Sequence, residues 1–268
     1  MRKHFKKYAS SISFLLLILL LAMLGPILGS DPNAIDPDLP TAGPSLLHWF
    51  GTDDLGRDLL SRTAVGARIS LAIGLATAVV AVIIGTAYGT ASALLEGKVD
   101  NVMMRVIDVI YSLPALMIVI LFSVFLGRSV WSLVLALALF SWPDTARIIR
   151  GQLLSLKREE FIEAYHSLGG DVFRLIRLHF IPNLLGLIIL TATITVPRAI
   201  LTESTLSFVG LGVEPPLSSW GTLASEGWQL VRVAPHMMFF PALMIVATMV
   251  ALNLLGDALR DQFDPKSA

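Results

Sequence analysis

The chain has 268 residues, of which 55% are hydrophobic and 15% are charged, and its mean hydropathy is +0.75. Soluble domains are typically about 45–50% apolar and about 25% charged, so this composition is typical of a membrane protein. The formal net charge is zero, which excludes a general attraction to nucleic acid, and the absence of cysteine excludes disulfides, thiolate metal sites and cysteine nucleophiles.

Six apolar runs are long enough to cross a bilayer, since a spanning helix needs roughly 20 apolar residues. The alternation of apolar and polar residues expected of barrel strands is absent from these runs. The sequence therefore predicts an all-α, polytopic membrane protein with about six transmembrane helices. In chain order, the predicted spans are Ser11–Leu28, Ile69–Leu94, Val106–Leu126, Val130–Ile149, Leu184–Leu201 and His236–Leu255.

The first predicted span follows four basic residues and resembles a secretory signal peptide in that respect. Its apolar run continues to Leu28, and it lacks small residues at the usual cleavage spacing. These two features favour an uncleaved membrane anchor over a cleaved leader.

The lysines and arginines set the predicted orientation, because they concentrate in cytoplasmic loops. With the N-terminus inside, fourteen of the 20 basic residues fall in inner segments and six in outer ones, Arg198 among the outer six. We therefore expect both termini, and the long segment between the fourth and fifth spans, to be cytoplasmic.

The predicted outer segment, residues 29–68, starts with turn-forming residues and continues with a mixed, partly apolar stretch. Its leucines would share one face of a helix capped by Thr52 or Asp53. The pattern predicts a short interfacial helix that leads into the second span, in which Asp58 and Arg62 could form an ion pair. An outer contact for a partner protein is the alternative.

A charged segment with two apolar helical faces separates the fourth and fifth spans. Helical periodicity follows Lys157, two glycines interrupt it, and Asp171 is placed to cap a second short helix. Pro182 and Asn183 mark the return of the chain to the membrane. We call residues 157–182 the two-helix segment. An ordinary solvated loop is the simpler interpretation, but apolar faces in the cytosol need lipid or protein against them. These apolar positions are Phe161, Ala164, Tyr165 and Leu168, then Val172, Leu175, Ile176 and Leu178.

The two-helix segment resembles the EAA loop of permease subunits in ABC importers, through the order E-A-x-x-x-x-G and, twelve residues later, I-P. In that family the loop sits in a cleft of a cytoplasmic ATPase subunit and transmits its motion. The resemblance places Glu163 and Ala164 at the start of the motif, Gly169 at its corner, and Ile181 with Pro182 at its end.

Three positions depart from the family's pattern. Tyr165 stands where the family has a second alanine, His179 stands in place of an isoleucine, and Ile181 in place of a leucine. The fit of Tyr165 to a partner therefore does not follow from the resemblance.

Four further strings, in the right order, resemble the oligopeptide and dipeptide branch of these importers in its C-type permease. They are FGTDDLGRDLLSR at 50–62, GARISL at 66–71, TESTLSFVGLG with PPLSSWG at 202–221, and NLLGDALRDQFDP at 253–265. The resemblance implies the type I permease fold of ABC importers in a bacterial inner membrane. It divides the chain into residues 1–68, with the first span and outer segment, a permease domain at 69–257 with a coupling loop at 150–183, and a cytoplasmic tail at 258–268.

As implied by the resemblance, the chain forms half of a pathway for short peptides and pairs with a second permease. Two cytoplasmic ATPase subunits and an extracytoplasmic substrate-binding protein complete the expected assembly. The residues expected to couple the pathway to the ATPases are Phe161, Glu163, Ala164, Leu168, Gly169 and Pro182. Import of nickel chelates by the same machine is the nearer alternative, and an ion-driven secondary carrier is the more distant one.

The sequence contains no motif for ATP hydrolysis or metal binding. Its only Gly-Lys pair, Gly97-Lys98, is followed by Val99 and lacks the earlier glycine of a phosphate-binding loop. We therefore expect no cofactor and no metal on this chain, with ATP and magnesium held by the separate ATPase subunits. The five histidines are scattered, which disfavours a metal site.

Carboxylates in the middle of a span would suggest an ion or proton pathway. The sequence predicts that Asp108, Asp144, Glu203 and Asp257 lie near span ends, with Pro143 and Arg147 beside Asp144 at the end of the fourth span. On this interpretation no carboxylate is buried mid-span, which disfavours a proton-coupled carrier.

Glycine and proline mark where the spans pack or bend. Gly85 and Gly89 have the GxxxG spacing that lets two helices approach closely. Pro114, Pro197 and Pro241 interrupt later spans and predict kinks there.

Overall fold

The computed structural model describes residues 12–20, 22–23, 25, 31–167 and 171–263. Over these residues the chain is helical apart from its connections and an isolated bridge between Thr52 and Asp58. Four of the described helices are long and apolar enough to cross a membrane, and a bent pair of helices would make a fifth span. The all-α membrane architecture is therefore confirmed. The first predicted span lies partly outside the described residues; those of its residues that are described are helical.

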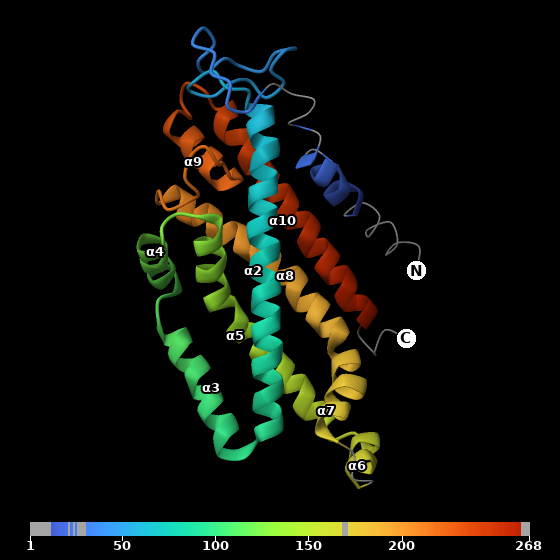
Figure 1. The fold of residues 1–268 in the computed structure, drawn as a ribbon. Coiled ribbons are helices and arrows are strands. Elements are labelled where there is room, and N and C mark those ends of the chain that lie inside the picture. Colours follow the sequence, from blue (N-terminus) through green and yellow to red (C-terminus); the bar gives the residue numbers. More distant parts are fainter. Residues whose placement is uncertain (1–11, 21, 24, 26–30, 168–170, 264–268) are drawn as a thin grey trace.

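The long helices run alongside one another, and short helices lie at both ends of the bundle (Figure 1). The spanning helices are α2 (Leu59–Leu95), α5 (Val130–Leu156), α8 (Ile181–Phe208) and α10 (His236–Phe263). The others are α3 (Gly97–Ser112), α4 (Ala115–Leu126), α6 (Glu160–Ser167), α7 (Val172–Leu175), the π-helix η1 (Ile176–Phe180) and α9 (Trp220–Gln229).

Helices α2 and α5 form the closest pair in the centre of the bundle. A Cβ atom added to Gly85 would lie 2.6 Å from the carbonyl oxygen of Trp142, and one added to Gly89 would overlap the backbone of Ala146. The prediction that these two glycines allow close helix approach is confirmed. Since a side chain at either position would push α5 away, the glycines fix the distance between the two helices.

The third predicted span is interrupted at Pro114, as the sequence predicts. The chain breaks at Leu113 and Pro114, and α3 and α4 meet there at 82°. Pro114 precedes the first residue of α4, where its missing N–H leaves no hydrogen bond unmade. By contrast, Pro197 and Pro241 lie inside α8 and α10, which each continue through the proline.

The fourth span extends well beyond the predicted Ile149. Helix α5 contains Pro143 and continues to Leu156, so Asp144 and Arg147 lie in the middle of this helix and not near its end. Similarly, Arg198 lies within α8 and not in an outer loop, which corrects its place in the charge count. Polar side chains in the second half of α5 ended the apolar run, but they did not end the helix.

The predicted interfacial helix before α2 is wrong. Residues 52–58 form a tight turn, and α2 begins at Leu59 with Asp58 as its N-cap, whose Oδ2 accepts the N–H of Ser61 at 2.8 Å. Asp58 also contacts the ring of His48, at 2.9 Å, and it does not pair with Arg62.

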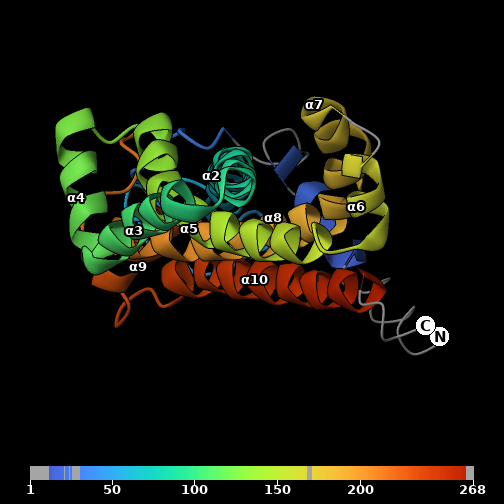
Figure 2. The ribbon, with the colours of Figure 1, turned by 90° about the horizontal axis from the view of Figure 1, so that it is seen from below.

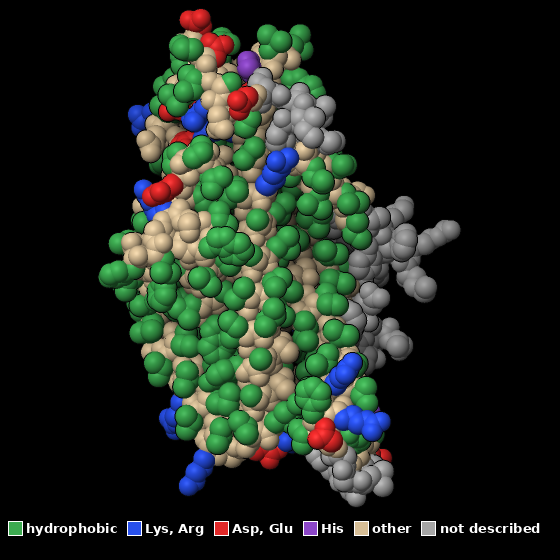
Figure 3. Space-filling view, in the orientation of Figure 1, with side chains coloured by type: hydrophobic (Ala, Val, Ile, Leu, Met, Phe, Trp, Pro, Cys, Tyr) green, Lys and Arg blue, Asp and Glu red, His purple; other side chains and the backbone are tan. Residues whose placement is uncertain are grey.

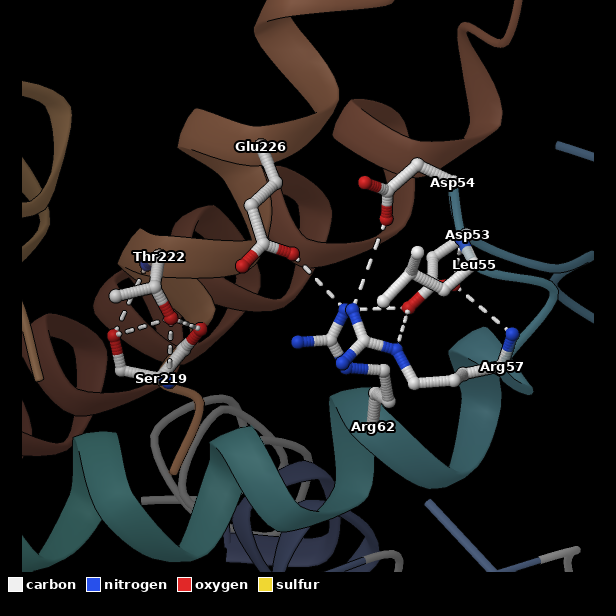
Figure 4. Close-up of polar contacts among 8 residues, drawn as sticks. All are labelled: Asp53, Asp54, Leu55, Arg57, Arg62, Ser219, Thr222 and Glu226. Atoms are coloured by element: carbon white, nitrogen blue, oxygen red, sulfur yellow. Dashed lines mark hydrogen bonds and ion pairs between the residues drawn. The ribbon is translucent and has the colours of Figure 1, made fainter. Parts of the chain in front are cut away.

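Arg62 instead pairs with Asp53 at 2.5 Å and with Glu226 of α9 at 2.9 Å, as Figure 4 shows. Asp53 also accepts a hydrogen bond from Nε of Arg57, at 2.6 Å. This network joins the outer segment, the start of α2 and α9 into one end cap of the bundle.

The surface of the bundle has the distribution expected for a membrane. In Figure 3, hydrophobic side chains cover the middle of the visible face, and charged side chains gather toward its two ends. Seen from below, α6 and α7 lie on the side of the bundle opposite α3 and α4 (Figure 2). Along the bundle, α6 and α7 lie at the lower end, and the outer segment and α9 at the upper end (Figure 1), so the two-helix segment and the end cap lie at opposite ends of an apolar belt.

Candidate functional site

The two predicted helical stretches of the two-helix segment are present, and the predicted corner at residues 169–170 lies outside the described residues. Helix α6 covers Glu160–Ser167, and α7 begins after Asp171, whose Oδ2 accepts the N–H of Arg174 at 2.9 Å. The described chain then continues without a break through η1 into α8. Of the predicted coupling residues, Leu168 and Gly169 lie outside the described residues, as do the side chains of Glu163 and Ala164.

One apolar cluster fastens the two-helix segment to the bundle. Ile162 of α6, Leu175 of α7 and Phe180 of η1 are fully buried or nearly so. They pack against the lower ends of three long helices, through residues Ala93 of α2, Ile149 and Leu153 of α5, and Leu184 of α8. A displacement of this segment must therefore act directly on α2, α5 and α8.

Lys157 adds a polar link between the same elements. Its Nζ donates to the carbonyl oxygen of Ala93, at 3.2 Å, and to Glu96 at the turn between α2 and α3. The hydrogen bond and the charge of Lys157 lower the pKa of the Glu96 carboxyl. The start of the two-helix segment is thus tied to the end of α2 by an ionised pair.

Two departures from the EAA pattern lie against each other. The rings of Tyr165 and His179 meet edge to face with centroids 5.4 Å apart, and the hydroxyl of Tyr165 donates to the carbonyl oxygen of Asp171 at 3.1 Å. Phe161 also lies beside His179, with ring centroids 5.9 Å apart. Tyr165 in α6 packs against the imidazole ring of His179 in η1, so the two departures from the pattern form one internal contact.

The outward side of the two-helix segment remains apolar. Phe161 is 45% exposed and Phe173 is 72% exposed, and Val172 and Leu178 are also exposed. Pro182 is exposed at the start of α8. Of the predicted second apolar face, only Leu175 and Ile176 pack inward. Phe173 was missed by the sequence analysis because it does not fall on the helical stripe formed by its neighbours.

A cavity of about 640 Å³ opens among α3, α4, α5 and α8. Apolar side chains such as Leu116 and Phe140 form one part of its wall, and threonines of α8 another. Three charged side chains and one phenol also line the cavity, namely Asp144, Arg147, Arg198 and Tyr111.

The charged residues of this cavity form a connected cluster. Nη1 of Arg198 lies 3.2 Å from Oδ2 of Asp144, and the hydroxyl of Tyr111 donates to the other oxygen of Asp144. The guanidinium of Arg147 lies 4.6 Å from the centroid of the Tyr111 ring and pairs with Asp108. The prediction that Asp144 lies near a span end is wrong, because α5 continues to Leu156, and no local sequence pattern connects Asp144 with Arg198.

Glu203 lies near the end of α8, as predicted, five residues before Phe208. It is fully buried inside α8, where its Oε1 accepts hydrogen bonds from the hydroxyls of Ser207, at 2.9 Å, and Ser219, at 2.6 Å. Ser219 is the N-cap of α9, so this carboxyl joins α8 to the end cap. Its neighbours give it a structural role.

Comparison with known proteins identifies the relatives of this chain. Residues 81–268 match the family described as binding-protein-dependent transport system inner membrane component. The chain is 45% identical to the oligopeptide transport system permease protein OppC of Bacillus subtilis, over 94% of this chain and 83% of that protein. It is 45% identical to OppC of Escherichia coli K12, over 98% and 88% of the two chains, and 42% identical to the dipeptide transport system permease protein DppC of B. subtilis, over 98% and 83%.

The fold is also found among solved structures. A chain of the MetNI methionine ABC transporter, in an inward-facing conformation, superposes with a TM-score of 0.61 at 18% identity, over 74% of this chain and 94% of that one. At this level of identity the similarity establishes the fold alone.

Proposed function

This chain belongs to the family of binding-protein-dependent transport system inner membrane components, and from that premise we propose that it forms half of the pathway through which an ATP-driven importer takes up short peptides. The observation that carries the proposal is the 45% identity to oligopeptide permeases over 94% of the chain. The fold and the multi-pass membrane character agree with it.

We propose that the two-helix segment is the contact with the ATPase subunits. Its inner face is fixed to α2, α5 and α8 by buried Ile162, Leu175 and Phe180, while Phe161 and Phe173 are exposed on its other side. An exposed apolar surface next to charged residues is typical of a protein-binding surface. The predicted coupling residues Glu163, Ala164, Leu168 and Gly169 belong to the same segment, with Pro182 where it joins α8.

Coupling in this proposal is mechanical. A conformational change needs contacts that differ in free energy between two states, and ATP binding to the partner subunits supplies that difference. The two-helix segment would pass the displacement to the lower ends of three long helices, which respond by opening the pathway to one side or the other. No chemical step and no cofactor on this chain is part of the proposal.

The complete assembly would contain a second permease, two ATPase subunits and an extracytoplasmic binding protein. The peptide substrate is inferred from the relatives named for oligopeptide and dipeptide transport. Import of a nickel chelate by the same machine would leave the fold and the two-helix segment unchanged.

The test is uptake by the complete transporter in proteoliposomes, with a labelled short peptide and ATP supplied to the ATPase side. We expect uptake that requires the ATPase subunits and is lost in the Glu163→Arg variant, which should still insert in the membrane. Uptake of nickel chelates without uptake of peptides would contradict the proposed substrate. Uptake that persists without the ATPase subunits and collapses with an uncoupler would contradict the proposed mechanism.

A further inference from the structure

The ion pair of Asp144 and Arg198 lies inside the apolar part of the bundle. Gly85 of α2 lies against Trp142, and Gly74 of α2 lies against Val196. Asp144 follows Trp142 by two residues in α5, and Arg198 follows Val196 by two residues in α8. The two glycines are separated by about 16 Å along α2, at 1.5 Å per residue, so the ion pair lies between two levels in the middle of a spanning helix.

The two charges of this ion pair are open to their surroundings. The side chain of Arg198 is 69% exposed and that of Asp144 is 50% exposed, at a depth where the neighbouring surface is apolar. A charge exposed to lipid at such a depth costs several kcal/mol, and intramembrane charges therefore face a water-filled cavity or a partner. Both residues line the cavity of about 640 Å³ described above, which is the size of a small-ligand site.

The ion pair uses a small part of its hydrogen-bonding capacity. A guanidinium carries five N–H donors, and Arg198 presents one terminal nitrogen to Asp144. Among the described residues this is the guanidinium's one side-chain contact, so its remaining donors are available to a carboxylate, which an arginine binds through two parallel bonds. Asp144 accepts hydrogen bonds from Tyr111 and Arg198. It is the anion of the pair, and it also lines the cavity.

Resting on the proposed function, we propose that the Asp144–Arg198 pair is a substrate subsite that takes both charged ends of a zwitterionic peptide: Arg198 binds the carboxylate and Asp144 the ammonium group. The ion pair exchanges its internal contact for two contacts with the peptide, so the site stays neutral at each stage. The apolar wall around Leu116 and Phe140 would accept side chains without selecting among them. Weak, exchangeable contacts of this kind suit a site that a substrate must leave again.

Because the sequence contains no cysteine, a single cysteine introduced at the cavity can be labelled selectively with a thiol reagent. Thr195 lines the cavity one turn from Arg198, and Ile189 stands on the same helix about 180° around the axis from Arg198. In the complete transporter in proteoliposomes, a charged thiol reagent should modify Thr195→Cys and leave Ile189→Cys largely unmodified. Absence of labelling at Thr195→Cys would mean that another chain or lipid covers the pair, and would overturn the proposal.

Peptide protection then tests the subsite itself. Trialanine with free ends should slow the labelling of Thr195→Cys, and adding Arg198→Gln should raise the trialanine concentration needed for half protection about tenfold, as expected for loss of one charge-assisted contact. Trialanine amide, which lacks the carboxylate, should be nearly insensitive to Arg198→Gln. Asp144→Asn should have the corresponding effect on trialanine and not on its N-acetylated form.

Two controls separate contact with substrate from a structural role. Arg198→Lys keeps the charge but cannot form the two parallel bonds, so its half-protection concentration should lie between those of the parent and of Arg198→Gln. Each variant should also co-purify with its partner subunits as the parent does. An equal loss of protection for free and blocked peptides, or none in either case, would overturn the proposal. ATP-driven peptide uptake by the parent protein, measured in the same proteoliposomes, tests the proposed function separately.

Discussion

Asp53 and Arg62 form a buried ion pair in the end cap. Asp53 is fully buried and lies between Arg57 and Arg62, and Arg62 also reaches Glu226 of α9. Breaking a buried ion pair from one side leaves an uncompensated charge, and this cost greatly exceeds the net value of the pair. The end cap therefore depends on both signs of charge being present.

Replacing Arg62 by alanine should destabilise the protein, because Asp53 and Glu226 lose the cation between them. We expect a loss of about 3 kcal/mol, the low end of the range for a broken buried pair, since Arg57 remains beside Asp53. The measurement is the thermal unfolding of the purified complex in detergent. Arg128→Ala is the matched control: its pair with Glu214 is 44% and 58% exposed and should contribute less than about 1 kcal/mol. Equal effects of the two substitutions would contradict this account.

At the scale of elements, the close approach of α2 and α5 is set by two glycines. A side chain at Gly85 would overlap Thr145 and the carbonyl oxygen of Trp142 on the facing helix. Because backbone atoms cannot move aside as a flexible side chain can, the helices would have to separate along their length.

Gly85→Leu should therefore lower the stability of the complex by about 3 kcal/mol, at the upper end of the usual cost of overpacking, and abolish uptake. Gly151→Ala is the control within α5, because a Cβ atom there has open space around it, and alanine favours the helix by about 1 kcal/mol over glycine. Thermal unfolding and uptake measure both effects. Retention of uptake by Gly85→Leu would show that the α2–α5 distance does not matter for function.

The exposed aromatic side chains of the two-helix segment allow a second test at the scale of elements. Phe173→Ser removes a ring that is 72% exposed, so the fold should be unaffected while co-purification of the ATPase subunits falls at least about tenfold, as expected for an aromatic residue central to an interface. Trp49→Ser removes a ring that is 69% exposed at the opposite end and should leave co-purification unchanged. Similar losses in the two variants would argue against a specific contact at the two-helix segment.

Sequence patterns predicted which helices form better than they predicted where each helix begins and ends. Apolar runs located α2, α5, α8 and α10 because lipid permits few other structures, and Asp171 was identified as a cap because its side chain acts locally. The end of α5 was misplaced because Asp144 and Arg147 lie in a cavity, and a cavity permits charge where lipid does not. The pairing of Asp144 with Arg198 joins helices far apart in the sequence, and no local pattern indicates it. A lone arginine within an apolar run was the one available signal.

The molecule as a whole has two different ends separated by an apolar belt. At one end, Arg62 joins the outer segment to α9, through its buried pair with Asp53 and its pair with the partly exposed Glu226. At the other end, the two-helix segment is packed on three long helices. The proposed function requires these ends to be on opposite sides of the membrane, since the binding protein and the ATPases work in different compartments.

The absence of native cysteine allows the sidedness of the whole molecule to be measured directly. Leu46 is 96% exposed in the outer segment, and Glu160 is exposed at the start of α6. The distribution of lysine and arginine predicts that Leu46→Cys reacts with a membrane-impermeant maleimide in intact spheroplasts, whereas Glu160→Cys reacts only in inside-out vesicles. Each variant serves as the control for the other, because both side chains are accessible and differ only in the end of the molecule that carries them. Labelling of Glu160→Cys from outside would place the two-helix segment out of reach of any ATP-hydrolysing partner, and the proposed coupling could not operate.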